Sequence, residues 1–346
     1  MSWLDLSSGL QLPKPKPLEA PTRSFHESGP TERMVGFLAA SVFSLAYIVS
    51  PVWVLAALLS PLFLSLRVSL VLSAPVLVSV LLLLLGFDSK DIGPAVLRSW
   101  PCQQIPKYFH YEEYHEITDA EAQSSGKSYI VGAHPHGVFS YVGVCAAVAT
   151  MNAHDGFGDQ LATKAPTAAA SVLKVFPLLK DVLGIFGVLP ADGKSLARQL
   201  KRGSVVLYIG GMAELFRSSP KRETVFLKGR KGFIKLALRE GADVIPVYLF
   251  GNTTVLVALT AGPLAELSRR LGVSLTLFWG RFGLPLPKPV RLTYARGAPL
   301  GLPHIAQPTE DDVNAWHAKY CEALVELFER YKGTNPDYKH KTLVIE

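Results

Sequence analysis

The most prominent pattern in the chain is a charge-free apolar stretch near its N-terminus, interrupted once. No Asp, Glu, Lys or Arg occurs from Met34 to Leu66, and after Arg67 none occurs from Val68 to Phe87. Each half is about as long as a helix that crosses a hydrocarbon core of roughly 30 Å. Because the polar break between the halves is short, a tight helical hairpin is expected, with both of its flanks on the same side of the membrane.

This stretch divides the chain into three parts. Residues 1–33 contain five prolines and scattered charges without apolar periodicity, which predicts a disordered tail. Residues 34–87 form the predicted membrane hairpin, with helices at about 35–59 and 66–87. Residues 88–346 are left for a globular domain, and we place this domain and both chain termini in the cytosol.

After Lys127 short apolar runs alternate with segments of helical periodicity. This alternation is typical of an α/β fold, so we expect a mixed or mostly parallel sheet flanked by helices. Cap residues such as Ser140, Gly203, Gly241 and Thr309 mark the ends of the predicted helices. Strands are predicted at 129–132, 204–209, 244–250 and 291–295, and helices at 141–151, 192–202, 226–240 and from 309 to 331.

The composition agrees with a lipid-facing surface. Hydrophobic residues make up 49% and charged residues 18% of the 346 residues, whereas charged residues make up about 25% of ordinary soluble domains. The formal charge of +7 favours anionic partners such as phosphates or acidic headgroups, and no feature of the sequence supports nucleic acid. Three widely spaced cysteines predict neither a disulfide framework nor a metal site.

Two histidines lie directly after the strand predicted at 129–132. In the motif His134-Pro135-His136-Gly137 they occupy the carboxyl end of that strand, where open α/β sheets usually bind ligands. Histidine has an unperturbed pKa near neutrality, so either imidazole is suited to remove a proton from a hydroxyl nucleophile. Gly137 would allow a substrate to approach closely, and the pair is therefore a candidate catalytic site.

A carboxylate follows another predicted strand. Gly210 and Gly211 end the strand at 204–209, and Glu214 comes three residues later. Paired glycines allow the backbone to approach a ligand, and Glu214 is placed either to orient an imidazole or to bind a substrate hydroxyl. The alternative is an ordinary glutamate at the start of a helix.

Cations precede the apolar face of the helix predicted at 226–240. Lys228, Arg230 and Lys231 come together just before Phe233. Cations oppose the dipole at the start of a helix, so a bound phosphate or pyrophosphate would relieve the conflict. The alternative is a solvated face beside the membrane.

Taken in order, these motifs resemble the type-2 diacylglycerol acyltransferase family, which also contains monoacylglycerol and wax-alcohol acyltransferases. The resemblance extends from the hairpin to the C-terminus. It includes Asn252, which we expect to bind substrate together with Phe233. The segments that carry it are Tyr108-Phe109, 134–137, 210–214, 230–233, Pro246-Val247, 250–252 and 283–287.

The resemblance implies a protein of the endoplasmic reticulum membrane, with lipid droplets as a further location, whose residues 88–346 are an acyltransferase domain. Such enzymes transfer a fatty acyl group from acyl-coenzyme A to a lipid hydroxyl and use no other cofactor. The family is also similar to glycerophosphate acyltransferases, in which a histidine is followed at short spacing by an aspartate. Here Phe139 and Tyr141 stand at the expected positions of that acid. We therefore expect Glu214 to supply it from another strand.

We expect His136 to act as the general base toward the acceptor hydroxyl of diacylglycerol, with His134 as its partner. The reverse assignment of the two histidines is the alternative. Backbone amides at the start of the following helix are expected to stabilise the oxyanion.

A monoacylglycerol or long-chain alcohol is the alternative acceptor. A function of a different class is a non-catalytic membrane protein that binds lipid or metal through the two histidines. The oligomeric state stays open, with a homo-oligomer among the alternatives.

Overall fold

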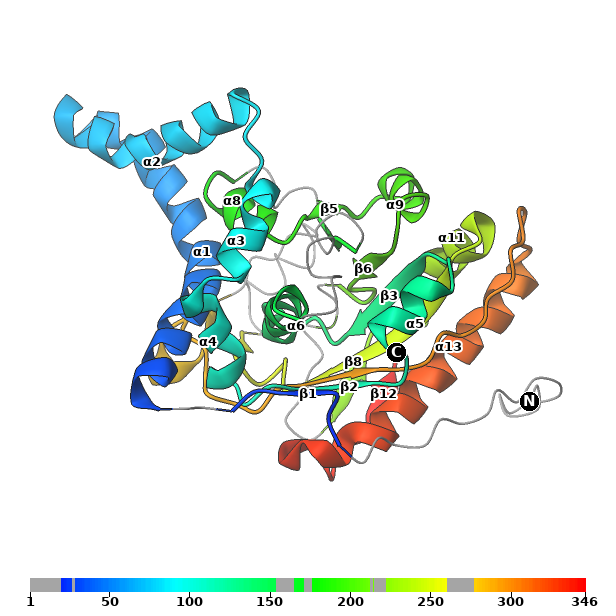
Figure 1. The fold of residues 1–346 in the computed structure, drawn as a ribbon. Coiled ribbons are helices and arrows are strands. Elements are labelled where there is room, and N and C mark those ends of the chain that lie inside the picture. The colour runs from blue at the N-terminus through cyan, green and yellow to red at the C-terminus, as the bar shows by residue number, and fades with distance from the viewer. Residues whose placement is uncertain are drawn as a thin grey trace.

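The computed structural model describes residues 20–26, 29–153, 165–170, 176–211, 214, 222–259 and 277–346. They form an α/β domain with an apolar helical hairpin that projects from one side (Figure 1). The fold class predicted from the alternation of apolar runs is therefore confirmed.

The hairpin consists of α1 (Pro30–Phe63) and α2 (Leu66–Leu84). Both are long and apolar enough to cross a membrane, with mean hydropathies of 2.2 and 2.3. The predicted bounds of 35–59 and 66–87 differ from these because Pro30 starts α1 early and the prolines within it do not end the helix. The indole of Trp53 donates to the carbonyl oxygen of Leu72 over 2.7 Å and joins the two helices.

The two halves of α1 have different surroundings. The N-terminal half packs on α4 (Trp100–Tyr108), where buried Gly36 lies against Gln104 and the ring of Phe37 lies 5.8 Å from the ring of Tyr108. A Cβ atom at Gly36 would lie 2.4 Å from the carbonyl oxygen of Gln104, so glycine permits the close approach of the two helices. The C-terminal half projects from the domain together with α2 (Figure 1).

The tail predicted over 1–33 needs correction where the structure describes it. Strand β1 (Arg23–Ser24) pairs antiparallel with β2 (Glu112–His115), and α1 begins within the same range. The guanidinium of Arg23 lies 3.1 Å from carboxylate oxygens of both Glu113 and Asp119. These ion pairs hold the segment at the sheet edge, while residues 1–19 and 27–28 lie outside the described part.

The main sheet has the strand order β1-β2-β11-β8-β3-β6-β4-β5. Its centre is parallel, since β3 pairs in parallel with β8 on one side and with β6 on the other, and β4 and β5 continue in the same direction. Antiparallel pairing of β11 with β8 makes the sheet mixed. The bounds are β3 Tyr129–His134, β4 Thr167–Ala169, β5 Leu189–Pro190, β6 Val205–Leu207, β8 Asp243–Phe250 and β11 Thr293–Arg296.

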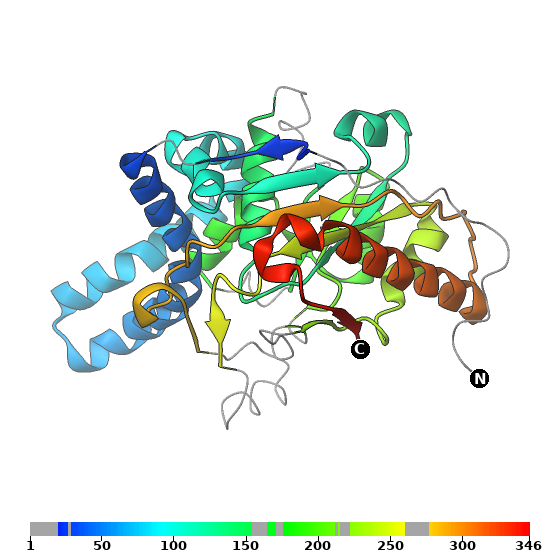
Figure 2. The ribbon, with the colours of Figure 1, turned by 90° about the horizontal axis from the view of Figure 1, so that it is seen from below.

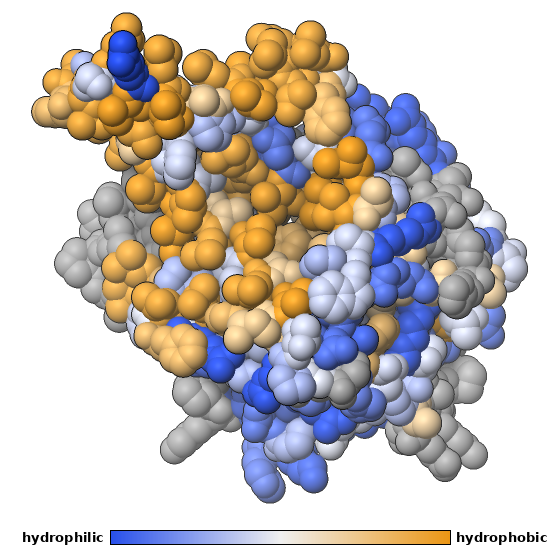
Figure 3. Space-filling view, turned by 60° about the vertical axis from the view of Figure 1, so that its left-hand side comes forward, coloured by the Kyte–Doolittle hydropathy of each residue, from blue (hydrophilic) through white to orange (hydrophobic). Residues whose placement is uncertain are grey.

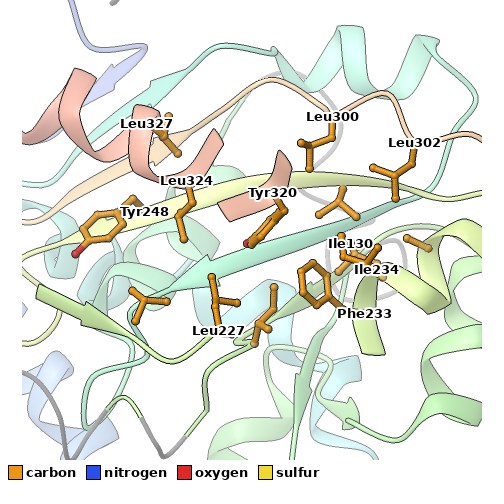
Figure 4. Close-up of a cluster of buried hydrophobic side chains, with 14 of the residues drawn as sticks. Ile130, Leu227, Phe233, Ile234, Tyr248, Leu300, Leu302, Tyr320, Leu324 and Leu327 are labelled. Atoms are coloured by element: carbon orange, nitrogen blue, oxygen red, sulfur yellow. The ribbon is translucent and has the colours of Figure 1, made fainter. Parts of the chain in front are cut away.

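Helices bury both faces of the sheet (Figure 2). One core contains α6 (Tyr141–Met151), α4 and the N-terminal half of α1. The other contains α11 (Gly232–Glu240) and α13 (Glu310–Tyr331), and Figure 4 shows their side chains meeting those of β3 and β8. The sheet is thus enclosed between one layer that contains α1, α4 and α6 and a second layer that contains α11 and α13.

The cap residues confirm most of the predicted helix ends. Ser140 caps α6 by accepting from the amide of Gly143, Thr309 caps α13, and Gly241 ends α11 in the left-handed conformation with φ 68°. The predicted start of the helix at 226 is wrong. Strand β7 (Glu223–Val225) pairs with β12 (Leu343–Ile345), and the amides of Leu227 and Lys228 donate to the carbonyl oxygen of Glu346, so α11 begins only after this extended segment.

Other elements of the described residues are short. They are η1 (Ser89–Asp91), α3 (Gly93–Leu97), α5 (Asp119–Ser124), α8 (Leu179–Gly184), α9 (Gly193–Leu200), β9 (Val257–Ala258), β10 (Phe278–Trp279), η4 (Arg281–Gly283), η5 (Lys332–Thr334) and η6 (Pro336–Tyr338).

We expect Gly36→Ala to destabilise the protein because the added methyl group collides with the backbone of α4. Overpacking of this kind costs about 1–3 kcal/mol. The midpoint of thermal unfolding of the full chain in detergent should fall accordingly. Gly232→Ala is the matched control, since it also adds a methyl group to a helix and no atom lies within 4 Å of the new Cβ. Equal midpoints for the two variants would contradict the close packing of α1 on α4.

Candidate active site

The parallel strands β3, β6 and β8 bring three segments together at their carboxyl ends. His134 is the last residue of β3, Gly210 and Glu214 follow β6, and Asn252 follows β8. His134 is completely buried, and its ring contacts a side chain on either side. Its Nδ1 lies 2.9 Å from Oε1 of Glu214, and its Nε2 lies 3.1 Å from the hydroxyl oxygen of Tyr320. The predicted meeting of a histidine and Glu214 is present in the structure.

Glu214 joins both histidines. Its Oε1 faces the His134 ring, while its Oε2 accepts a hydrogen bond of 2.8 Å from the backbone N–H of His136. The carboxylate is fully buried, and a buried charge requires such partners. Gly210 makes room for it, because a Cβ atom there would lie 2.0 Å from Oε1 of Glu214. Gly211, with φ 56°, turns the chain so that Glu214 returns over Gly210.

Tyr320 of α13 contacts the other side of His134. Its hydroxyl donates to the carbonyl oxygen of Gly132 over 3.2 Å, and a Cβ atom at Gly132 would lie 2.3 Å from that hydroxyl. Burial raises the pKa of the Tyr320 hydroxyl well above its ordinary value, so the phenol is neutral and has one proton to donate. With this proton directed to Gly132, Nε2 of His134 is the donor to Tyr320, and Nδ1 faces Oε1 of Glu214.

His136 has different surroundings. Its ring is half-buried, and Nδ1 lies 2.8 Å from the carbonyl oxygen of Gly137. A carbonyl oxygen only accepts, so Nδ1 carries the hydrogen and the neutral ring has its lone pair on Nε2. No residue in the described part of the chain forms a hydrogen bond with this Nε2. The ring of Tyr208 meets the imidazole edge-on at 5.0 Å, and burial raises the pKa of Tyr208 to about 12.

Asn252 holds the histidine turn from the β8 side. Its Nδ2 donates to the carbonyl oxygens of Pro135 and His136 over 2.9 and 2.8 Å, and its Oδ1 accepts from the amide of Val142. Gly137, with φ 65°, lies so close that a Cβ atom would approach the carbonyl oxygen of Asn252 to 2.8 Å. Both Gly137 and Asn252 are predicted to contact substrate; in the structure they are buried and hold the turn together.

The backbone amides expected to stabilise an oxyanion are already engaged. At the start of α6 the amides of Tyr141, Val142 and Gly143 donate to Phe139, Asn252 and Ser140. That prediction is therefore wrong for the first turn of the helix. The amides of residues 137–140 precede it, and none of them has a hydrogen-bond acceptor among the residues that the structure describes.

The basic segment before α11 is exposed. Lys228, Arg230 and Lys231 face solvent, and the ammonium of Lys231 lies 2.7 Å from the side-chain oxygen of Asn314. Phe233 is predicted to bind substrate, but it is buried with its ring 4.9 Å from the ring of Tyr320 (Figure 4). Phe233 is thus linked to His134 through Tyr320, and it does not lie on the exposed surface with the cations.

The sequence prediction missed Tyr320 and Tyr208. The spacing of apolar residues in α13 identifies Tyr320 as a core residue, which is correct, but spacing says nothing of its hydroxyl. A tyrosine in a core position usually finds a hydrogen-bond partner, and this was the available signal. Gly132, within the strand β3, was a second signal, because a glycine inside a strand often marks a close approach.

The sequence is similar to known proteins that are named as acyltransferases. The family model described as "Diacylglycerol acyltransferase" matches residues 76–346. The human protein named 2-acylglycerol O-acyltransferase 3 is 34% identical over 225 residues, which cover 60% of this chain and 65% of that protein. Bovine diacylglycerol O-acyltransferase 2 is 30% identical over 259 residues, or 68% and 69% of the two chains.

Among solved structures, the 1-acyl-sn-glycerophosphate acyltransferase PlsC of Thermotoga maritima aligns with a TM-score of 0.41 and 13% identity. The alignment covers 86% of this chain and 97% of that one. The match to the human relative named above spans slightly less than two thirds of that protein's length.

We expect the two histidines to differ in their reaction with diethyl pyrocarbonate. His136 should be modified in the folded protein, whereas His134 should be modified only after unfolding, because both of its ring nitrogens are occupied and its surface is buried. Mass spectrometry of peptides from the full chain in detergent separates the two sites, with exposed His340 as the reference for an accessible histidine. Modification of His134 at the rate of His136 would contradict the buried arrangement.

Proposed function

Because the chain belongs to the diacylglycerol acyltransferase family, we propose that it is a membrane-anchored O-acyltransferase that uses acyl-coenzyme A. The acceptor is diacylglycerol and the product triacylglycerol. The observation that carries the proposal is the imidazole of His136, whose Nε2 is unoccupied among the described residues at a turn held by Glu214 and Asn252. A monoacylglycerol is the second acceptor to consider, since the relative named for 2-acylglycerol is as similar as those named for diacylglycerol.

In the proposed reaction, Nε2 of His136 removes the proton of the acceptor hydroxyl while the hydroxyl oxygen attacks the thioester carbonyl carbon. The new C–O bond gives a tetrahedral oxyanion, and the amides of residues 137–140, which have no acceptor among the described residues, are proposed to stabilise it. The intermediate collapses by breaking the C–S bond. The thiolate of coenzyme A leaves and receives the proton from His136, so the base is regenerated. No other cofactor takes part.

The environment of His134 supports this assignment of roles. Its ring is fully buried between Glu214 and Tyr320, so a lipid hydroxyl has no path to either nitrogen without breaking one of these contacts. Glu214 then acts as a positioning residue. It holds His134 through its side chain and His136 through the backbone amide, and it does not contact the His136 ring.

The cations before α11 are proposed to bind the phosphates of coenzyme A. Lys228, Arg230 and Lys231 are exposed where α11 begins, and the positive end of that helix adds to their field. Phe233, in the first turn of α11, contacts Tyr320, which in turn contacts His134. The basic segment is therefore connected to the histidine turn by two successive side-chain contacts.

The hairpin is proposed to anchor the enzyme in the endoplasmic reticulum membrane, with the catalytic domain and both termini in the cytosol and with lipid droplets as a second location. Its helices carry exposed leucines and valines on most sides, and Figure 3 shows this hydrophobic surface over the projecting part of the molecule. Apolar surface of this extent requires lipid or protein to cover it.

Replacing His136 with alanine should lower acyl transfer by about 10²–10⁴-fold, the usual contribution of a general base. The assay uses labelled acyl-coenzyme A with a panel of diacylglycerol, monoacylglycerol and long-chain alcohols, and equal amounts of reconstituted protein. His340→Ala, at an exposed histidine, is the control. Full activity of His136→Ala would reject His136 as the base, and transfer to none of the acceptors by the unsubstituted protein would reject the function.

Replacing Lys228 and Arg230 together with alanine should raise the KM for acyl-coenzyme A with little change in kcat. If one phosphate contact contributes about 1.4 kcal/mol to binding, its loss should raise this KM tenfold. An acyl-coenzyme A analogue without the 3′-phosphate should reduce the difference between the variant and the parent. Lys194→Ala combined with Lys201→Ala, at exposed lysines at the two ends of α9, removes the same two charges and serves as the control for net charge. An unchanged KM would remove the basic segment from the substrate site.

A further inference from the structure

A second apolar surface lies outside the hairpin. At η4 the chain presents Phe282 and Leu284 to solvent, with 74% and 53% of their surfaces exposed. Phe282 has φ 59°, a conformation that is rare and strained for a bulky side chain. The strain is not offset by burial of the phenylalanine within the protein. We refer to residues 282–284 as the apolar tip.

The apolar tip is held in place by its neighbours. The hydroxyl of Ser44 in α1 donates to the carbonyl oxygen of Pro285 over 2.8 Å, and the hydroxyl of Tyr108 in α4 donates to Pro287 over 2.8 Å. The guanidinium of Arg281 lies over the ring of Phe37, 5.0 Å from its centroid. These contacts fix the segment against two helices, so the exposure of the tip is built into the fold.

The surface next to the tip is also apolar. Met34, Leu38 and Val42 follow one another at intervals of four residues on the outer side of α1, and each is more than half exposed. The stripe runs beside Phe37, which Arg281 contacts, and it leads into the projecting half of α1. Figure 3 shows hydrophobic surface extending from the hairpin onto the body of the domain. Through the contact of Arg281 with Phe37, the tip lies beside the part of α1 that carries this stripe.

We propose that the apolar tip and this stripe of α1 insert into the boundary between the headgroups and acyl chains of the bilayer that holds the hairpin. The inference rests on the membrane anchoring proposed above. Phe282 and Leu284 would exchange water for lipid, which is favourable for apolar surface. Arg281, at the base of the tip, would lie at the level of the lipid phosphates, as is usual for basic residues beside an interfacial apolar face. The tip fixes which side of the domain faces the membrane.

The test attaches an environment-sensitive fluorophore to Phe282→Cys in the full chain, reconstituted in phosphatidylcholine vesicles that contain nitroxide-labelled lipid. Cys321 is replaced by serine, and the parent without the new cysteine is the labelling blank, because the other two thiols are buried. We expect a blue-shifted emission that shallow nitroxides quench several-fold more than at Ser124→Cys. Ser124 is an exposed residue at the end of α5 and serves as the matched control.

Equal quenching at residues 282 and 124 would overturn the proposal. So would a label that is protected from aqueous iodide but is not quenched by the lipid nitroxides, since protein would then cover the tip. Leu284→Cys provides a second position that should behave like 282. Unchanged thermal unfolding of each labelled variant excludes misfolding as the cause. The readout needs no catalysis, so an inactive but correctly inserted protein would reject the proposed function and leave the membrane contact in place.

Discussion

The buried carboxylate of Glu214 is the interaction on which the candidate site depends. Its two oxygens join the ring of His134 to the backbone of His136, and in this way the ends of β3 and β6 are held to one another. Removing the partner of a buried, hydrogen-bonded polar group leaves that group unsatisfied, which costs about 1–3 kcal/mol. The buried position of this carboxylate also requires a glycine at position 210, because any side chain there would occupy the space of the carboxylate.

The same four-residue motif places two identical side chains in opposite environments. His134 lies inside the domain, where Tyr320 and Glu214 occupy its two nitrogens and fix its orientation. His136 lies two residues later on the open side of the turn, and the carbonyl of Gly137 fixes its hydrogen on Nδ1. One imidazole is thereby a structural part of the site, and the other has a lone pair that no residue in the described part of the chain contacts by a hydrogen bond. The division follows from burial and hydrogen bonding, and the motif alone does not reveal it.

Much of this arrangement could be predicted from the sequence, because it depends on local patterns. Charge-free runs located the hairpin, and cap residues located the starts of α6 and α13 and the end of α11. The general rule for parallel sheets brought His134 and Glu214 to the same edge. The contacts of Tyr320, Phe233 and Asn252 could not be predicted. They depend on how α11, α13 and β8 pack in three dimensions, and no local spacing specifies which buried side chain meets which.

The residues that replace the expected acid provide a physical reason for taking it from another strand. Phe139 and Tyr141 stand where the resemblance to glycerophosphate acyltransferases would place an aspartate. Both residues contact α1. The ring of Phe139 stacks on Phe43 at 5.8 Å, and the hydroxyl of Tyr141 donates to the carbonyl oxygen of Ala40 over 3.2 Å. An acid at either position would be placed against the apolar side of α1 and would incur a desolvation cost. With Glu214 supplied by the segment after β6, these two positions are free to pack the histidine turn directly on α1.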